Sequence, residues 1–387
     1  MTSSGRAATS DDVDAVRVAL IGANGHGRWH RRLIASLDRV QLVGLADPRP
    51  IEPDPPPAEG TALFTDYREL LSATAPEVVV ICTPPHTHLP IALDVLDAGC
   101  DLLLEKPPVA SLAGYRTLAA QLNATGRACQ VGFQALASQA WARFRDAVAA
   151  GPATSVSAMA SWQRDDAYYQ RAPWAGRRHV GGRPVIDGAL VNPLAHAVVQ
   201  ALASATAAGA GRPRRLAVER YRTRPIEVDD TAFARVTFDS GLTVTVAVTL
   251  AGEDFIAGQI DAVLPDGPAM LEYPTDRLAL PGDPAPVTVE GREDLLTNLL
   301  EYRASGVPLL VPLEATRDFT AVLEALTEPD VPTPTLIDDK YLHYADGVRV
   351  IRGVNALVRQ VAQTGALPSE LGVSWAVAPY ERRVPVG

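Results

Sequence analysis

Residues 18–30 read VALIGANGHGRWH, an apolar strand followed by a glycine-rich turn and the start of a helical pattern. Glycines in such a turn allow a tight reversal and a close approach of the backbone to a pyrophosphate, while the helix N-terminus behind them offers unpaired N–H groups. The stretch therefore predicts the first strand, turn and helix of a doubly wound α/β domain that binds a dinucleotide. The residues expected to contact the cofactor here are Gly22, Asn24, Gly25, His26 and Gly27.

An ordinary glycine-rich turn would look the same on its own, and this one departs from GxGxxG because Asn24 stands at the second glycine. Asp47 strengthens the prediction, because it closes the next strand 20 residues after Gly27. An acidic residue there accepts hydrogen bonds from the adenosine ribose and repels a 2′-phosphate. Asp47 could also be a turn residue before Pro48. We therefore expect NAD, while Arg49 keeps NADP possible.

The first part of the chain alternates short apolar runs with helical stretches. Apolar strands separated by helices are what a parallel sheet covered on both faces requires. Residues 15–150 are therefore predicted to form this α/β domain, a Rossmann domain, after a disordered lead-in over 1–14. The expected strands are VRVALIG, VQLVGLAD, EVVVICTPP, DLLLEKP and ACQVGFQ, with helices from about 26 and over 88–98 and 112–124.

Residues 151–387 show a different pattern, in which apolar and polar residues alternate. TAFARVTF and LTVTVAVTLAG are separated by Asp239, Ser240 and Gly241, a hairpin signal. The pattern predicts a mostly antiparallel sheet from about 153 to 280, interrupted by a helix over 192–208. Helices over 294–303 and 315–326 are expected to pack back on the first domain.

Composition limits the classes of function. A net charge of −10 over 387 residues argues against a nucleic-acid binder, which needs basic side chains to replace counterions. No long apolar run and no secretion signal is found, so we expect a cytoplasmic protein without a membrane span. The three cysteines lie in apolar runs and are interpreted as buried free thiols; no zinc-like Cys/His spacing stands out, and no metal site is expected.

Lys106 follows an apolar strand in LLLEKP, which places it at a strand's carboxyl end, where doubly wound folds bind ligands. A lysine beside a nicotinamide can take or supply the hydroxyl proton while a hydride moves. The alternative is an exposed lysine paired with Glu105.

Residues 82–111, CTPPHTHLPIALDVLDAGCDLLLEKPPVAS, resemble the Gfo/Idh/MocA oxidoreductase family through the TPPHTH turn and the EKP tripeptide. GRPVIDGALVNPLAH and the segment GREDLLTNLLEYRASGVPLLVPLEATRDF extend the resemblance. It implies a Rossmann domain followed by an open-faced sheet, NAD or NADP, and hydride exchange with a sugar, polyol or cyclitol, with Lys106 as proton donor or acceptor. The further cofactor contacts that it implies are Thr83, Pro84, His88, Glu105 and Lys106.

The chain departs from the family pattern D-x-G-x-H-x-x-D after Asp187, because Val191 and Leu194 replace its histidine and second aspartate. Asn192 and His196 lie four residues apart and on one helix would face the same side, where they could grip a substrate hydroxyl. Asp187, Asn192 and His196 are thus candidate catalytic residues. Each also has a structural reading, as a turn residue, a helix cap and a core histidine respectively.

Trp162, Arg164 and Tyr168 are candidate substrate contacts, because aromatic faces with polar edges suit sugar-like ligands. Packing at a sheet edge or an oligomer surface would explain them equally. A homo-oligomer through the C-terminal sheet is expected. The leading hypothesis is a dehydrogenase or reductase; the alternatives are glycoside cleavage by transient oxidation and a cofactor-binding sensor or partner subunit without turnover.

Overall fold

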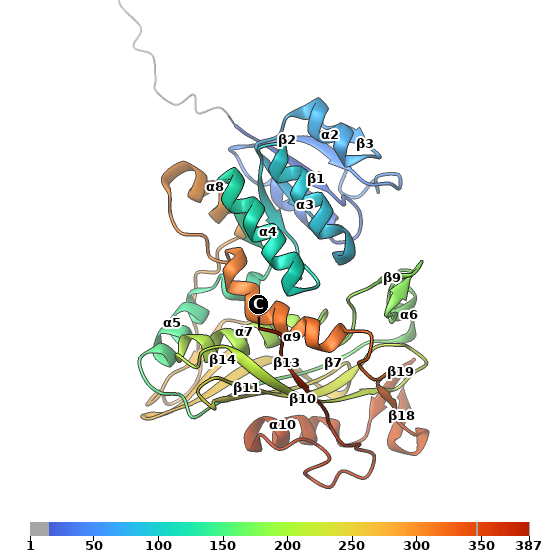
Figure 1. The fold of residues 1–387 in the computed structure, drawn as a ribbon, viewed down its shortest axis with the longest axis vertical. Coiled ribbons are helices and arrows are strands. Elements are labelled where there is room, and N and C mark those ends of the chain that lie inside the picture. Colours follow the sequence, from blue (N-terminus) through green and yellow to red (C-terminus); the bar gives the residue numbers. More distant parts are fainter. Residues whose placement is uncertain (1–14, 346, 387) are drawn as a thin grey trace, which may run out of the picture.

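A computed structural model describes residues 15–345 and 347–386 (Figure 1). Two separate large sheets dominate it, and the helices α5, α7 and α9 lie between them. The lead-in predicted over residues 1–14 lies outside the described residues. Within the described part of the chain, no helix combines the length and apolar character that a membrane crossing needs.

The first sheet has six parallel strands in the order β3-β2-β1-β4-β5-β6. Its central strands are buried along their whole length, because helices cover both faces and each apolar run packs on two sides. The order reverses between β1 and β4, which is the point where such sheets form a ligand crevice. The strands are β1 Val16–Ile21, β2 Val40–Ala46, β3 Ala62–Phe64, β4 Val78–Ile81, β5 Asp101–Leu104 and β6 Cys129–Val131.

Four helices accompany these strands. The side chain of Asp66 caps α2 by accepting from the Arg68 N–H, and that of Ser111 caps α4 by accepting from the Gly114 N–H. No side chain caps α1, which follows the glycine turn, so its first N–H groups can meet a ligand instead. The bounds are α1 Gly27–Ala35, α2 Tyr67–Thr74, α3 His88–Asp97 and α4 Leu112–Thr125. The predicted Rossmann architecture is confirmed.

The second sheet has ten strands in the order β16-β15-β14-β13-β7-β12-β11-β10-β17, with β20 also paired to β10. The β7–β12 and β10–β17 pairs are parallel and the others antiparallel, so the mostly antiparallel prediction is confirmed. The expected hairpin joins β11 and β12, with Thr231 opposite Thr249. The strands are β7 Ser155–Gln163, β10 Pro213–Arg222, β11 Thr231–Phe238, β12 Thr243–Thr249, β13 Ala251–Leu264, β14 Gly267–Glu272, β15 Arg277–Ala279, β16 Val287–Thr288, β17 Thr335–Leu336 and β20 Tyr380–Arg383.

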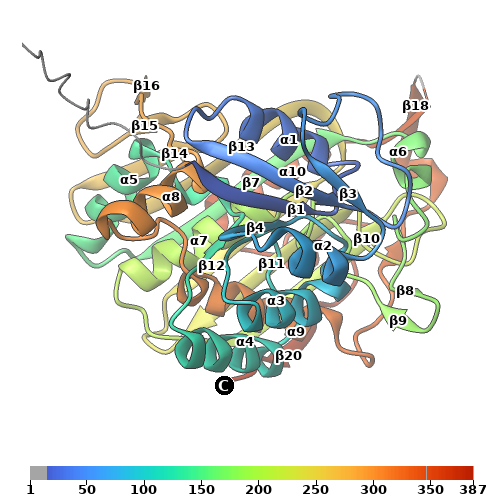
Figure 2. The same ribbon diagram turned by 90° about the horizontal axis from the view of Figure 1, so that it is seen from above.

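The inner face of this sheet looks toward the Rossmann domain (Figures 1 and 2). Helix α7 (Ala195–Ala207) packs on β7, β12 and β13, and α5 (Gln139–Ala149) packs on α7 and β14. Helix α8 (Leu295–Ser305) contacts β5 and β6, and α9 (Arg317–Thr327) contacts α4. These last two helices bring the later part of the chain back against the first sheet.

The outer face of the second sheet is covered by the C-terminal part of the chain. Helix α10 (Val354–Thr364) packs on β7, β12 and β13, and β19 (Val348–Ile351), paired with β18 (Leu342–Ala345), also contacts β13. Met159, Phe233 and Ala247 from the sheet share one apolar cluster with Val358 of α10. The apolar side chains of α10 therefore bury this part of the outer face. The homo-oligomer through the C-terminal sheet stays a prediction.

Candidate cofactor and catalytic site

Two glycines of the turn after β1 are required by packing. A Cβ atom on Gly22, whose φ is +87°, would lie 2.4 Å from the Cys82 carbonyl oxygen, and one on Gly27 would lie 2.0 Å from the Gly22 oxygen. Gly25 has open space where its Cβ would be. The turn therefore packs tightly against the strand behind it, and it leaves room at Gly25 and the uncapped α1 N-terminus. This arrangement fits a dinucleotide pyrophosphate.

Asn24, at the position of the second glycine, has a structural role. Its side-chain Nδ2 donates to the Pro50 oxygen at 3.0 Å, and its Oδ1 accepts from the Glu52 N–H at 2.8 Å. The residue is not among the described non-glycine residues with positive φ, so its tolerance of that conformation does not explain it. Asn24 instead fastens the proline-rich loop that follows β2 onto the glycine turn.

Asp47 lies beside this turn at the end of β2. Its Oδ2 accepts from the Asn24 N–H at 3.2 Å, and its Oδ1 accepts from the backbone N–H of Arg49 at 3.0 Å. The carboxylate is 5% exposed, whereas the Arg49 side chain, which also contacts it, is 67% exposed. The structure thus brings Asp47 to the glycine turn, and its contact with the ribose stays a prediction.

Lys106 follows β5 and reaches across to the second domain. Its Nζ donates to both the backbone oxygen and the side-chain Oδ1 of Asn192, each at 3.0 Å. An ammonium has three protons, so one remains for a ligand. Burial lowers the pKa of Lys106, and the negative charges of Glu105 and Asp187 oppose that shift. The alternative reading, an exposed ion pair with Glu105, is not what the structure contains.

Asp187 sets the orientation of Asn192. The Asn192 Nδ2 donates to Asp187 Oδ1 at 2.9 Å, so its Oδ1 is left to face Lys106. The Gly176 N–H in turn donates to Asp187 Oδ2 at 2.7 Å. Three of the candidate residues, Lys106, Asn192 and Asp187, therefore form one hydrogen-bonded chain. We call this chain the lysine relay.

The helix predicted from residue 192 begins only at Ala195. Residues 188–194 form turns, starting at Gly188, whose φ is +121° and whose Cβ would lie 2.8 Å from Asp229 Oδ1. Asn192 is therefore not on one helical face with His196, so the predicted helical placement of Asn192 was wrong. A contact of both side chains with one hydroxyl stays a prediction. The positive φ of Gly188 and its close approach to Asp229 cannot be recognised from local periodicity.

His196 lies on the first turn of α7 against apolar neighbours. Its ring is edge-on to Phe133, with ring centres 5.7 Å apart, and its Nδ1 is buried with no hydrogen-bond partner among the described residues. Burial, followed by the charge of Lys106, lowers the pKa of His196 to about 3. The imidazole is therefore neutral near neutral pH.

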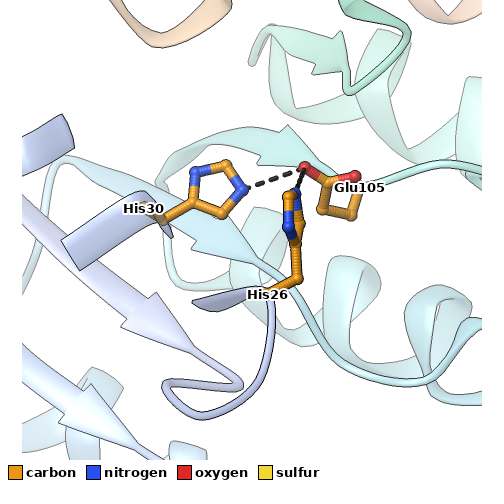
Figure 3. A group of neighbouring side chains, drawn as sticks. All are labelled: His26, His30 and Glu105. Carbon is orange, nitrogen blue, oxygen red and sulfur yellow. Dashed lines mark hydrogen bonds and ion pairs between the residues drawn. The ribbon is translucent and has the colours of Figure 1, made fainter. Parts of the chain in front are cut away.

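Glu105 is held by two histidines rather than by Lys106 (Figure 3). Its Oε1 lies 2.9 Å from His30 Nε2 and 3.5 Å from His26 Nε2. Burial favours the neutral acid, but the hydrogen bonds from His26 and His30 outweigh it and hold the pKa of Glu105 below its usual range. Sequence reasoning missed His30, although its position one helical turn after His26 was a usable signal.

His88 does not line the crevice as a direct contact, because it is completely buried. Its Nδ1 lies 2.9 Å from the Pro107 oxygen and its Nε2 lies 2.8 Å from the Thr83 oxygen. It therefore connects the loops that follow β4 and β5. Thr83 and Pro84 lie at the start of the loop that follows β4. His88 contacts the Thr83 backbone oxygen and so helps to hold this loop in place.

The expected substrate residues lie together at the end of β7 and in the short helix α6 (Asp166–Gln170). The Arg164 guanidinium lies over the rings of Trp162 and Tyr168, 5.0 Å from each centre. The guanidinium of Arg171, which the sequence analysis did not single out, also lies over the Tyr168 ring, 3.6 Å from its centre. The small hairpin of β8 (His179–Val180) and β9 (Arg183–Pro184) follows them.

A cavity of about 440 Å³ lies between the start of α1 and the start of α8. His26, His30 and Glu105 form part of its wall, together with Trp29, Gln134 and Arg292. It lies at the carboxyl ends of β5 and β6, next to the glycine turn, so it adjoins the crevice expected for the nicotinamide half of the cofactor.

Comparison with known proteins identifies the N-terminal part of the chain. Residues 16–133 match the model of the Gfo/Idh/MocA group, described as an oxidoreductase family with an NAD-binding Rossmann fold. An inositol 2-dehydrogenase from Saccharopolyspora erythraea is 31% identical over 140 residues, which are 35% of this chain and 41% of that protein. A glycosyl hydrolase family 109 protein from Shewanella pealeana is 29% identical over 106 residues, or 24% and 23% of the two chains.

The fold similarity extends further than the sequence similarity. The crystal structure of the WlbA dehydrogenase from Bordetella pertussis, in complex with NADH and UDP-GlcNAcA, covers 84% of this chain and 100% of its own, with a TM-score of 0.68 and 20% identity. The curated relatives, by contrast, are matched over less than half of their length. The glycine turn, the Rossmann sheet and the family match together show that residues 16–133 form an NAD-binding Rossmann domain of the kind found in the Gfo/Idh/MocA oxidoreductases.

Proposed function

We propose that this protein is an NAD-dependent dehydrogenase acting on a CH–OH group of a sugar, polyol or cyclitol, with Lys106 as the proton donor or acceptor. The observation that carries the proposal is the lysine relay. The Lys106 ammonium is fixed by two acceptors on Asn192 at the carboxyl end of β5, and it keeps one N–H for a ligand. NAD, when bound, supplies the acceptor or donor of the hydride.

The choice of lysine at this position supports a proton-transfer role. The chain contains 35 lysines and arginines, and only two of them, Lys106 and Lys340, are lysines. Arginine stays protonated in proteins, whereas a buried lysine can release its proton. In a chain that otherwise uses arginine for positive charge, a lysine in the crevice is therefore best explained by chemistry that arginine cannot perform.

The other residues of the site would bind and orient the substrate. Asp187 and Asn192 hold the Lys106 ammonium in one place, so that a substrate hydroxyl meets its free N–H in a defined direction. Trp162 and Tyr168 pack against the Arg164 guanidinium and hold it in place, and this guanidinium would offer donors for the hydroxyls of a sugar. The inositol dehydrogenase among the relatives supports this class of substrate.

Glycoside cleavage through transient oxidation is a second candidate, favoured by the glycosyl hydrolase family 109 relative. Such a reaction would use the same lysine relay but would return the hydride, so reduced cofactor would not accumulate. A cofactor-binding sensor without turnover is a third candidate. Such a sensor would not need a fixed lysine ammonium that keeps one N–H for a ligand.

The test is a turnover assay with NAD over a panel of sugars, sugar acids, polyols and inositols, followed through the absorbance of reduced nicotinamide. Stoichiometric oxidation of one substrate class supports the dehydrogenase. Release of the aglycone from an aryl glycoside without accumulation of reduced cofactor would support glycoside cleavage instead. Tight NAD binding with neither activity would favour the sensor.

A further inference from the structure

Two histidines and a carboxylate converge at the start of α1. His26 and His30 are one helical turn apart, and Glu105 reaches them from the end of β5, 75 residues later in the chain than His30 (Figure 3). One ring nitrogen of each histidine and one carboxylate oxygen of this group all lie within 4.8 Å of one another. The sequence had predicted no metal site, because the third side chain comes from a distant strand.

We propose that His26, His30 and Glu105 bind one divalent transition-metal ion of the zinc class. Two imidazoles and one carboxylate form a common three-residue zinc site, and imidazole also suits cobalt and nickel. The proposal goes beyond the dehydrogenase activity, since it assigns a cation to His30 and to two residues, His26 and Glu105, that were expected only to contact the cofactor.

The distances suit such an ion. In a tetrahedral site with ligands at ~2.0–2.2 Å from the metal, the ligand atoms lie about 3.3–3.6 Å from each other. Glu105 Oε1 is 3.5 Å from His26 Nε2 and 2.9 Å from His30 Nε2. A shift of a few tenths of an ångström in the Glu105 side chain would open the shorter contact enough. The two distances from Glu105 are thus close to those of such a site, and the third lies within 4.8 Å.

The burial of the three side chains also suits a bound ion that a ligand can reach. The His30 side chain is 2% exposed and that of Glu105 is 13% exposed, so these two form the inner part of the site. The His26 side chain is 59% exposed and completes it from the outside. The adjoining 440 Å³ cavity leaves room for a water molecule or a ligand oxygen at a fourth position.

Hydrogen bonding alone explains only part of this arrangement. The His30–Glu105 contact satisfies the buried carboxylate without any ion. His26 does not need a contact with Glu105, because its exposed imidazole can form hydrogen bonds with water. Its Nε2 nevertheless points inward at the same carboxylate oxygen. Restricting an exposed side chain costs conformational entropy, and a metal–ligand bond would offset that cost.

The experiment uses the full-length chain, freed of metal with a chelator and then dialysed against Zn²⁺ or Co²⁺. We expect one equivalent of metal by elemental analysis and, with Co²⁺, the visible ligand-field absorption of a low-symmetry site. His26→Asn is the main variant, because this exposed side chain can be replaced without disturbing the core. It should weaken Zn²⁺ binding by about 100-fold or more, given that even outer-shell partners cost ~10–100-fold.

His179→Asn is the matched control, because His179 is exposed on β8 and lies outside the cluster. This control variant should bind Zn²⁺ with the same affinity as the unmodified chain. Zn²⁺ should also raise the melting temperature of the unmodified chain and of His179→Asn, but not of His26→Asn, since only a folded site binds the ion. Substoichiometric metal, or equal affinity in His26→Asn and the unmodified chain, would overturn the proposal.

Discussion

The Lys106 ammonium lies 3.0 Å from each of two oxygens of Asn192, one on the backbone and one on the side chain. Lys106 belongs to the loop after the Rossmann strand β5, whereas Asn192 belongs to the turn before α7 on the second sheet. The contact therefore fixes the Lys106 ammonium of the first domain by two acceptors of the second. Its position depends on how the two domains are packed, and not on β5 alone.

Replacing Lys106 by methionine should lower turnover by ~10²-fold or more and leave NAD affinity within a few-fold. Methionine keeps much of the length and packing of the side chain but has no proton to transfer. The measurements are steady-state kinetics on the substrate found in the panel and calorimetric titration with NAD. Lys340→Met is the control, because Lys340 is the exposed second lysine of the chain and should leave both values unchanged. Unchanged turnover in Lys106→Met would remove this residue from the mechanism.

Replacing Asp47 by alanine should weaken NAD binding and narrow or reverse the preference for NAD over NADP. The carboxylate can accept hydrogen bonds from the ribose and repels a 2′-phosphate, and its loss leaves the Arg49 guanidinium without that partner. Titration of both cofactors into both proteins measures the ratio. If the ratio of the two affinities is the same with and without Asp47, the carboxylate is not at the ribose.

Two glycine substitutions in the turn should have different effects. Gly22→Ala places a methyl group 2.4 Å from the Cys82 oxygen, so we expect a loss of folding stability greater than the ~1–3 kcal/mol of backbone strain alone. Gly25 also has a positive φ, but a Cβ atom there would meet no atom within 4 Å. Gly25→Ala should therefore lose less folding stability and mainly weaken NAD binding. Urea unfolding and NAD titration distinguish the two. Equal losses of stability would show that the tight contact at Gly22 is relieved by movement.

The buried His196 imidazole should make stability depend on pH. Its pKa in the folded protein is lowered to about 3, whereas an unfolded histidine takes up a proton near pH ~6.5. Between these values the unfolded chain binds more protons, so the free energy of unfolding falls as the pH drops from about 6.5 toward 3. His196→Gln should therefore lose less stability than the unmodified protein between pH 7 and pH 5 in urea titrations. The exposed His343→Gln variant is the control. Parallel pH profiles for His196→Gln and the unmodified chain would contradict this assignment.

The sequence predicted the elements that follow from local patterns, namely the Rossmann strands, the helix after Ser111 and the β11–β12 hairpin. Periodicity, caps and turn residues are contained within short stretches, so they can be recognised in one sequence. Lys106 could be placed at the crevice for the same reason. The contact of Asn192 with Lys106, however, joins residues 86 positions apart and depends on the turn at Gly188. The inward direction of His26 and the burial of His88 also depend on packing between distant segments.

The covering of the outer sheet face by α10 has a consequence for synthesis on the ribosome. Strand β12 ends at Thr249 and α10 begins at Val354, about 100 residues later, or roughly 5–20 s at ~5–20 residues per second. During that interval Ala247 and Met159 have no helix to pack against, although they are almost fully buried in the finished fold. The nascent chain therefore exposes an apolar sheet surface until α10 has been synthesised. A chain that stopped before Val354 would keep that surface exposed to solvent.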